Sequence, residues 1–377
     1  MKIVLVMDQF DENTNGTTVS ARRFAKGLED RGHDVRIVTT GKEGKNRYIV
    51  PAKEHGIVAF FCKKQGMILG KPNKKVLKEA FEGADVIHFL MPFSLARKGK
   101  KIADSMNIPS TTAFHVQPEN ITHNIGMKHL EFLSDAIYYG FRDIFYKKFT
   151  EIHCPSNFIA GELKNHGYKS NIHVISNGVS DVFVPEETEK KDMFKDKFTI
   201  LMIGRYSPEK RQDVLINAIA KSKYNDKIQL VLAGKGPDEL KYKKLANEKL
   251  ANKALFGFFK QEDLLQIIRM SDLYVHSAEI EIEAISCIEA FACGVVPVIS
   301  NSKKSATKQF AIDDRSLFKV NDTDDLAKKI DYFIEHPEER KALGEKYAEK
   351  ANEYRLSQSI IKIEEMFKDG IKNYNKK

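Results

Sequence analysis

Two glutamates near the C-terminal third of the chain have a spacing that suits the binding of a sugar attached to phosphate. Glu281 and Glu289 lie eight positions apart, and Glu289 falls in an apolar run that ends at Gly294. Eight residues are slightly more than two helical turns, so both carboxylates face one side if Glu281 begins the helix. Phosphates bind at helix N-termini, and carboxylates accept hydrogen bonds from sugar hydroxyls. The alternative is an amphipathic surface helix whose glutamates face solvent.

Two cations form a second candidate group. Arg205 and Lys210 lie five positions apart, after an apolar segment that ends at Gly204 and around a turn that contains Pro208. Cations at the end of a strand stabilise a departing diphosphate, because its negative charge grows in the transition state. The alternative is a solvated loop with two ordinary surface cations.

Together these patterns resemble the Glu-x7-Glu and Gly-Arg-x4-Lys signatures of retaining, nucleotide-sugar-dependent glycosyltransferases of the GT-B fold, family 4. The resemblance covers nearly the whole chain and is strongest to bacterial diacylglycerol glucosyltransferase-like members. It implies an α/β protein with two Rossmann-like, doubly wound domains that face each other across a cleft. The catalytic residues that it implies are His115, Arg205, Lys210 and Glu281.

The resemblance also implies donor-binding and acceptor-binding positions. The donor-binding positions are glycines of strand-end turns, a residue at the base edge, and the helix that carries the second glutamate. They are Gly16, Gly204, Gly234, Gly236, Phe258, Ala284, Ile285, Ser286 and Glu289. Thr17 and Glu119 are the implied acceptor-binding residues.

Two positions depart from the pattern of the family. Arg211 stands where the family usually has glycine, and Glu281-Ile-Glu-Ala284 stands where it usually has Glu-Gly-Phe-Gly. The missing glycines change how closely the backbone can approach the sugar. The identity of the donor therefore stays open, and Glu283 is a rival of Glu281 for the sugar contact.

No metal or other cofactor is expected for the chemistry, and the co-substrate implied by the resemblance is a UDP-sugar. Asp322-Thr-Asp324 matches the metal-binding pair of another glycosyltransferase fold. Because it opens a charged helical stretch far from the other motifs, helix capping explains it better.

Alternating strands and helices must position these residues. The expected strands are apolar runs separated by helices, as in parallel sheets covered on both faces. They span 2–7, 34–39, 85–89, 110–114, 198–203, 228–233, 254–256, 273–276 and 296–299. A polar, charged stretch at 181–195 indicates a linker, and a helix is expected at 282–292. The predicted domains are 1–182 for the acceptor, 183–355 for the nucleotide-sugar, and a C-terminal helix at 356–377 that returns to the first domain.

The charge is concentrated in the first half. Through Val179 there are 26 Lys and Arg against 18 Asp and Glu, a balance of +8 within a total of +9. No nucleic-acid-binding motif accompanies this charge, so the expected partners are an acidic substrate and an anionic membrane surface. The chain lacks an apolar run of 18 residues, and its N-terminus does not resemble a signal peptide.

Two segments of the first half could lie on a membrane. One is Val58–Leu69, with lysines at 71, 74, 75 and 78, and the other is a helical stripe. The stripe contains Leu130, Leu133, Ile137, Phe141, Ile144 and Phe145. A helix that faces the core is the alternative for the stripe. Basic residues and inserted apolar side chains both contribute to membrane binding.

The sequence therefore predicts a transferase that moves glucose or galactose from a UDP-sugar to the hydroxyl of a lipid such as diacylglycerol. Its expected location is the cytoplasm, at the periphery of the inner face of the membrane. A soluble or polysaccharide acceptor, or nucleotide-sugar binding without transfer, are the alternatives.

Overall fold

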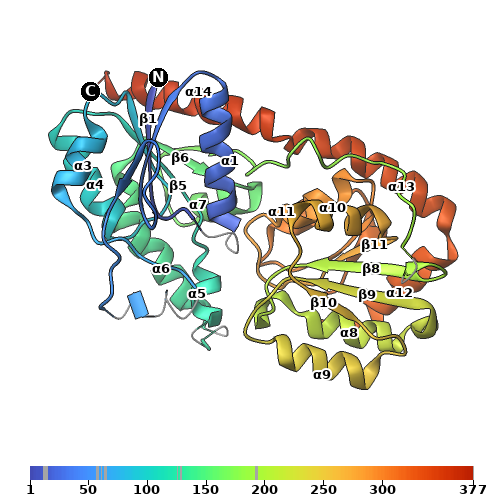
Figure 1. The fold of residues 1–377 in the computed structure, drawn as a ribbon. Coiled ribbons are helices and arrows are strands. Elements are labelled where there is room, and N and C mark those ends of the chain that lie inside the picture. The colour runs from blue at the N-terminus through green and yellow to red at the C-terminus, as the bar shows by residue number, and fades with distance from the viewer. Residues whose placement is uncertain are drawn as a thin grey trace. The chain divides into compact units, whose positions relative to one another are not determined.

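The computed structural model describes residues 1–11, 16–56, 59–60, 62, 66–124, 126–127, 130–191 and 194–376. The chain forms two compact units. Unit 1 contains Met1–Gly178 and Leu356–Lys377, and unit 2 contains Val179–Arg355. Each unit is a parallel sheet with helices packed on it (Figure 1).

The seven-stranded sheet of unit 1 has the order β3-β2-β1-β4-β5-β6-β7. Its strands are β1 (Lys2–Gln9), β2 (Asp34–Thr40), β3 (Arg47–Ile49), β4 (Val86–Phe89), β5 (Ser110–Ala113), β6 (Glu151–Cys154) and β7 (Asn171–Val174). Its helices are α1 (Gly16–Asp30), α3 (Lys74–Phe81), α4 (Ser94–Ser105), α5 (Pro118–Asn124), α6 (Glu131–Ile144), α7 (Asn157–Asn165) and α14 (Leu356–Tyr374). Seven of the eight residues of β1 are buried, which explains its continuous apolar run.

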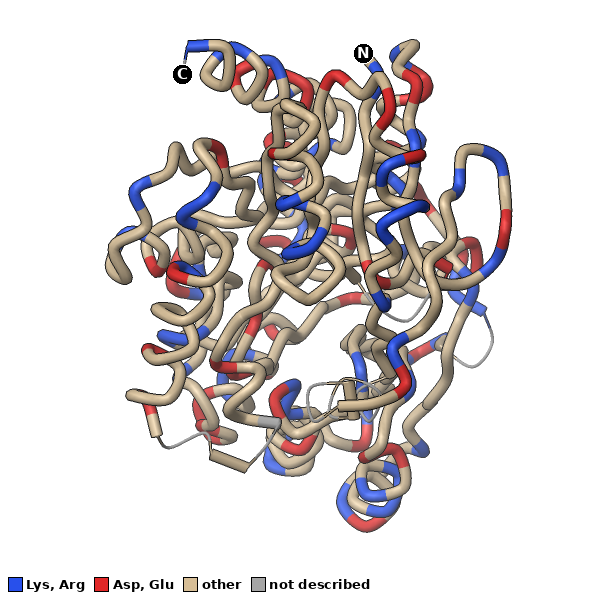
Figure 2. The backbone as a smooth tube through the Cα atoms, turned by 90° about the vertical axis from the view of Figure 1, so that its left-hand side faces the viewer, with Lys and Arg blue, Asp and Glu red and all other residues tan. Residues whose placement is uncertain are grey.

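The C-terminal helix α14 is part of the core of unit 1. Ile360, Ile363, Met366 and Phe367 are buried in the cluster that also contains residues of β1 and α1. A side chain at Gly27 of α1 would come within 2.6 Å of Ile360, so glycine permits the close approach of α1 and α14. Charges of both signs are interspersed along α14 (Figure 2).

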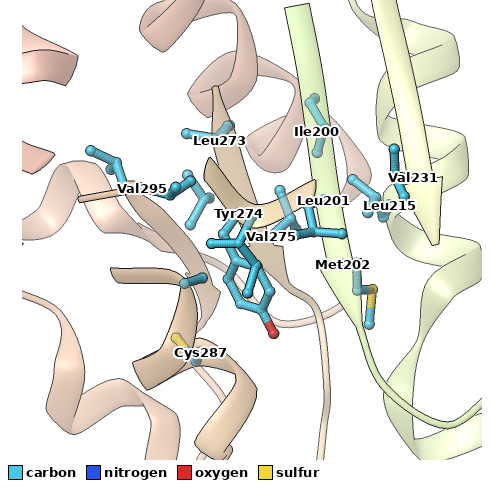
Figure 3. Close-up of a cluster of buried hydrophobic side chains, with 14 of the residues drawn as sticks. Ile200, Leu201, Met202, Leu215, Val231, Leu273, Tyr274, Val275, Cys287 and Val295 are labelled. Carbon is cyan, nitrogen blue, oxygen red and sulfur yellow. The ribbon is translucent and has the colours of Figure 1, made fainter. Parts of the chain in front are cut away.

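The six-stranded sheet of unit 2 has the order β10-β9-β8-β11-β12-β13. Its strands are β8 (Phe198–Ile203), β9 (Ile228–Ala233), β10 (Leu255–Gly257), β11 (Leu273–His276), β12 (Pro297–Ser300) and β13 (Leu317–Phe318). Its α-helices are α8 (Gln212–Lys221), α9 (Glu239–Lys249), α10 (Gln261–Met270), α11 (Ile285–Ala292), α12 (Thr323–Glu335) and α13 (Pro337–Lys350). Figure 3 shows its core, in which Leu201 of β8, Val275 of β11 and Cys287 of α11 are buried.

The strand order reverses direction at one point in each sheet. The reversal lies between β1 and β4 in unit 1 and between β8 and β11 in unit 2. In open parallel sheets, ligands bind beside the carboxyl ends of the strands at such a point. The loops after β8 and β11 are therefore where a ligand of unit 2 is expected.

The predicted α/β class and the two Rossmann-like sheets are confirmed. Four of the described strands, β3, β6, β7 and β13, were not predicted. The helix expected at 282–292 begins only at Ile285. Ala284, the residue before it, has a φ of 65°. This left-handed conformation ends the preceding loop, and a sequence pattern reveals it only when the residue is glycine.

Candidate functional site

An ion pair lies at the switch point of unit 2. Lys210 ends the short 3-10 helix η3 (Pro208–Lys210) after β8, and its Nζ contacts Oε2 of Glu281, which follows β11. The hydroxyl of Ser277 holds η3 in place by donating to the carbonyl oxygen of Arg211 at 2.8 Å. The loops after two neighbouring strands thus bring together two of the four predicted catalytic residues.

The electrostatics of this pair favour full charges. Burial alone would raise the pKa of Glu281, but Lys210 and the adjacent His276 outweigh it and lower the pKa to about 2. Burial alone would lower the pKa of Lys210, but Glu281 raises it. Arg205 acts in the opposite direction on the pKa of Lys210, so the two cations lie close enough to interact. An anion that approaches this loop meets two positive charges and one resident carboxylate.

The backbone of Glu281 is fixed outside the helix that it precedes. Glu281 pairs with Ser305 in a parallel bridge, and the amide of Ala306 donates to its carbonyl oxygen at 2.8 Å. Because α11 begins only at Ile285, Glu281 does not share a helical face with Glu289, contrary to the simplest reading of the spacing. Glu289 lies within α11 and is 8% exposed.

The rival glutamate has a different environment. Glu283 is 1% exposed, and its charge is one of the influences that raise the pKa of Tyr354, after the burial of that tyrosine. Glu281 contacts Lys210. The geometry therefore favours Glu281 for the proposed sugar contact.

The start of α11 contains three of the predicted donor-binding residues. Ala284 is 7% exposed, whereas Ile285 and Ser286 are half-buried. The hydroxyl of Ser286 lies 3.0 Å from that of Tyr274, a buried residue of β11. First-turn amides of a helix have no partner within the helix, so this end can receive a phosphate.

The predicted donor-binding glycines have a structural role within unit 2. A side chain at Gly234 would lie 1.9 Å from the carbonyl oxygen of Gly204, and one at Gly236 would lie 2.3 Å from that of Tyr206. The loops after β8 and β9 therefore pack backbone against backbone. Gly234 and Gly236 are required by this packing, whether or not a nucleotide also approaches, whereas a side chain at Gly204 would meet only Lys210, at 3.9 Å.

Phe258, the residue predicted at the base edge, follows β10. Its ring is 56% exposed, and Lys235 Nζ lies 4.7 Å from the ring centroid. An exposed ring beside a cation is a surface on which a nucleobase can stack.

The predicted residues of unit 1 follow β1 and β5 in the sequence. Gly16 and Thr17 begin α1, and His115 follows β5. Glu119, in α5, accepts a hydrogen bond from the hydroxyl of Tyr138 at 3.3 Å, and burial raises its pKa. Residues 12–15, which precede Gly16, lie outside the described residues.

His115 belongs to a cluster of three histidines. Its ring lies 5.1 Å from that of His153, which lies 6.3 Å from the ring of His88, centroid to centroid. All three line a small cavity with apolar residues such as Phe24 and Phe367. Burial lowers the pKa of His153 to about 4 and holds those of His88 and His115 well below 6.5, so the cluster is neutral at pH 7.

Sequence reasoning missed His276 and Tyr274. His276 is the last residue of β11, and its Nε2 lies 3.3 Å from Oε2 of Glu281. A histidine at the carboxyl end of a strand was the available signal, and the same signal had singled out His115. However, a histidine within the apolar run of β11 is equally well explained as an ordinary core residue.

The Asp322-Thr-Asp324 pair has a structural role. Asp322 caps α12 by accepting from the amides of Asp324 at 3.1 Å and Asp325 at 2.9 Å. In the described part of the chain, no cluster of three His, Cys, Asp or Glu could hold a metal ion. Of the helices in the described ranges, none has the length and apolar character needed to span a bilayer.

Comparison with curated proteins gives relatives along most of the chain. Alpha-monoglucosyldiacylglycerol synthase of Streptococcus pneumoniae is 27% identical over 80% of this chain and 71% of its own length. A GDP-mannose-dependent alpha-mannosyltransferase of Corynebacterium glutamicum is 26% identical over 78% of this chain and 71% of its own length.

A solved structure shares the fold along nearly the whole chain. HepE of Anabaena, in complex with UDP and glucose, is 17% identical over 98% of this chain and 100% of that chain, with a TM-score of 0.76. The catalytic domain of cholesterol-alpha-glucosyltransferase from Helicobacter pylori is 53% identical over 42% of this chain and 98% of that chain, with a TM-score of 0.41.

Two family models match consecutive parts of the chain. Residues 14–182 match "Glycosyltransferase Family 4", and residues 183–350 match "Glycosyl transferases group 1". With two Rossmann-like parallel sheets, this chain belongs to the GT-B glycosyltransferases that combine a family 4 domain with a group 1 domain.

Proposed function

We propose that this glycosyltransferase is a retaining hexosyltransferase, which moves glucose or galactose from a UDP-sugar to the hydroxyl of a membrane lipid such as diacylglycerol. The observation that carries the proposal is the cluster of Arg205, Lys210 and Glu281. It offers two cations to a diphosphate and a fixed carboxylate to sugar hydroxyls.

In the proposed reaction, the bond between sugar C1 and the diphosphate oxygen breaks, and its electron pair goes to the diphosphate. The acceptor oxygen bonds to C1 on the same face, and its proton passes to the departing diphosphate. Arg205 and Lys210 offset the charge that builds on the diphosphate. Glu281 binds the sugar hydroxyls, and Glu289 accepts the two ribose hydroxyls. In unit 1, His115, Thr17 and Glu119 help to place the acceptor.

The lipid acceptor is supported by the surface of unit 1. In α6 only Ser134 and Tyr138 are buried, whereas Phe132 is 63% and Ile144 is 53% exposed. Of the predicted stripe, Leu130 and Ile144 are exposed, Leu133, Ile137 and Phe141 are half-buried, and Phe145 is buried. Part of the stripe is therefore available to a membrane, and part packs on the protein. Phe60, 65% exposed, adds to the apolar surface. Phe61, Lys63 and Lys64 of the same predicted segment lie outside the described residues.

The excess of basic residues in the first half supports a location at the periphery of an anionic membrane. The two first-half segments supply apolar side chains, and the lysines supply attraction. The S. pneumoniae relative is by name a glucosyldiacylglycerol synthase, which agrees with a lipid acceptor.

Product analysis tests the reaction. The full chain is incubated with radiolabelled UDP-glucose, UDP-galactose or GDP-mannose and with diacylglycerol, a sterol or a soluble sugar, and the product's anomeric configuration is read by NMR. We expect an α-linked glycolipid from one of the UDP-sugars. Transfer only from GDP-mannose overturns the donor assignment, a soluble product overturns the lipid acceptor, and binding without transfer overturns the enzyme.

Vesicle binding tests the membrane surface. Phe132→Ser with Ile144→Ser, and Lys74→Glu with Lys75→Glu, should weaken binding to anionic vesicles at low salt. High salt should weaken wild-type binding, because the screening length is only about 10 Å at 0.1 M. Leu240→Ser is the matched control, since Leu240 is 81% exposed but lies in unit 2. Equal binding by all variants contradicts the proposal.

A further inference from the structure

A buried chain of polar side chains leads from the start of α11 to Glu281. Tyr274 is fully buried and His276 is 1% exposed. The Tyr274 hydroxyl lies 3.0 Å from Ser286 Oγ and 3.2 Å from His276 Nδ1. On the other side of its ring, His276 Nε2 lies 3.3 Å from Glu281 Oε2. Figure 3 shows the ring of Tyr274 extending from its strand toward the helix that carries Cys287.

The donors and acceptors along this row of side chains can be assigned in one direction. Burial raises the pKa of Tyr274 well above its usual range, so its hydroxyl keeps its proton. When that hydroxyl donates to Nδ1 of His276, the neutral imidazole carries its proton on Nε2. The Nε2–H group then faces the carboxylate of Glu281. The opposite tautomer would turn a nitrogen lone pair toward a carboxylate, which is repulsive.

Lys210 is the main partner of this carboxylate in the structure. Lys210 Nζ contacts Oε2 of Glu281, and His276 Nε2 has no well-aligned hydrogen bond at its distance of 3.3 Å. A donor diphosphate competes for Lys210, as the proposed function requires. A buried carboxylate that loses its cation is costly unless another donor takes its place.

We propose that His276, oriented by Tyr274, is a positioning residue that holds the Glu281 carboxylate in place while Lys210 is occupied by the donor diphosphate. A small rotation of the carboxylate aligns one oxygen on Nε2–H. The other oxygen is then free to accept from a sugar hydroxyl. This inference rests on the proposed function, and it adds two buried residues to the determinants of the reaction.

Kinetics of three variants test the inference. His276→Leu keeps a similar volume but has no donor, whereas His276→Gln keeps an N–H group of similar reach. We expect kcat of the Leu variant to fall about 10- to 100-fold, as for loss of a hydrogen bond to a charged group. The Gln variant should recover most of this loss, Tyr274→Phe should fall between them, and UDP affinity by calorimetry should stay within about twofold of wild type.

A matched control separates positioning from stability. Tyr347 is another fully buried tyrosine of unit 2, and its hydroxyl accepts from the amide of Ile312 at 3.0 Å. Tyr347→Phe should lower Tm about as much as Tyr274→Phe and leave kcat unchanged. If the Leu and Gln variants lose kcat equally, or if kcat follows Tm in all variants, His276 has only a structural role and the inference is overturned.

A second readout does not depend on activity. Long-range ¹⁵N NMR spectra of histidine-labelled protein report which imidazole nitrogen carries the proton, and His276→Gln identifies the signal. We expect the Nε2–H form in wild type and a mixture of tautomers in Tyr274→Phe. A dominant Nδ1–H form overturns the inference. Absence of transfer by wild type with every donor overturns the proposed function instead, so the two failures are distinguishable.

Discussion

The buried polar residues of the two units differ in their charge. In unit 1, three histidines share an apolar cavity and are neutral, because burial depresses their pKa values. In unit 2, burial is outweighed by pairing, so Lys210 and Glu281 both stay charged. Neutral donors and acceptors suit an uncharged hydroxyl, whereas paired charges suit an anion that can exchange partners with them. The contrast agrees with the proposal that unit 1 binds the acceptor and unit 2 the diphosphate.

The largest expected effect concerns the charges of unit 2. Lys210→Met and Arg205→Met should each lower kcat about a hundredfold, because each removes a cation that offsets charge on the departing diphosphate. Steady-state kinetics with the donor and acceptor identified above measure the effect. Lys244→Met, on the exposed part of α9, is the matched control. Near-normal turnover of both site variants would show that the diphosphate binds elsewhere.

Two glutamates of unit 2, Glu281 and Glu283, test the role of the paired charges further. Glu281→Gln should impair transfer by roughly tenfold or more, because the amide offers one acceptor oxygen instead of two. Glu283→Gln should have little effect on kcat, since the charge of Glu283 acts on Tyr354 whereas Glu281 contacts Lys210. Parallel rate measurements distinguish the two, and the reverse order would exchange their roles.

The histidines of unit 1 predict a dependence of stability on pH. The pKa of His153 is about 4 in the folded state and 6.5 in the unfolded state, so the unfolded state binds more protons below pH 6.5. This contribution to stability is complete above pH 6.5 and is lost as the pH falls toward 4, by roughly 3 kcal/mol.

His153→Gln removes this term and can still donate to the carbonyl oxygen of Ile175, the partner of His153 Nε2 at 2.7 Å. The stability difference between variant and wild type should therefore shift toward the variant as the pH falls, measured by hydrogen exchange of unit 1 amides. A difference that is constant from pH 7 to 4 would mean that the pKa of His153 is the same in the folded and the unfolded state. Glu281 provides the contrast, since a pKa of about 2 makes its contribution constant until the pH falls below 4.5.

The smallest expected effect concerns backbone strain. In unit 1, the described non-glycine residues with positive φ are Asn46 and Asn107, a type that tolerates this conformation. Next to the unit 2 site they are Arg211 and Ala284, which tolerate it less well. Ala284→Gly should raise the stability of unit 2 by about 1 kcal/mol, and Asn107→Gly should change that of unit 1 by less. Urea unfolding measures both, and a destabilised Ala284→Gly would indicate that the alanine side chain has a packing role.

The sequence predicted nine of the thirteen described strands, because these are short apolar runs bounded by turn residues. It missed β3, β6, β7 and β13, which are very short, partly exposed or interrupted by charged and polar residues. It also predicted Lys210 and Glu281 by motif and spacing, and the structure brings them into contact. His276 and Tyr274 were missed, because their contacts depend on the pairing of β11 with β8 and on the path of the following loop. The start of α11 was misplaced for a related reason, since Ala284 does not reveal the left-handed turn that glycine would have marked.

The path of the chain also affects the order in which the protein can fold during synthesis. Unit 2 is one continuous segment inserted into unit 1, and its first and last residues, Val179 and Arg355, form a bridge. Gly178 and Leu356 likewise adjoin within unit 1, where a side chain at Gly178 would lie 2.7 Å from Leu356 Cα. Unit 2 is therefore complete on the ribosome while unit 1 still lacks α14. Until the last helix emerges, the apolar surface that Ile363 and Phe367 cover stays open, so premature termination before Leu356 should yield an aggregation-prone chain with an intact second unit.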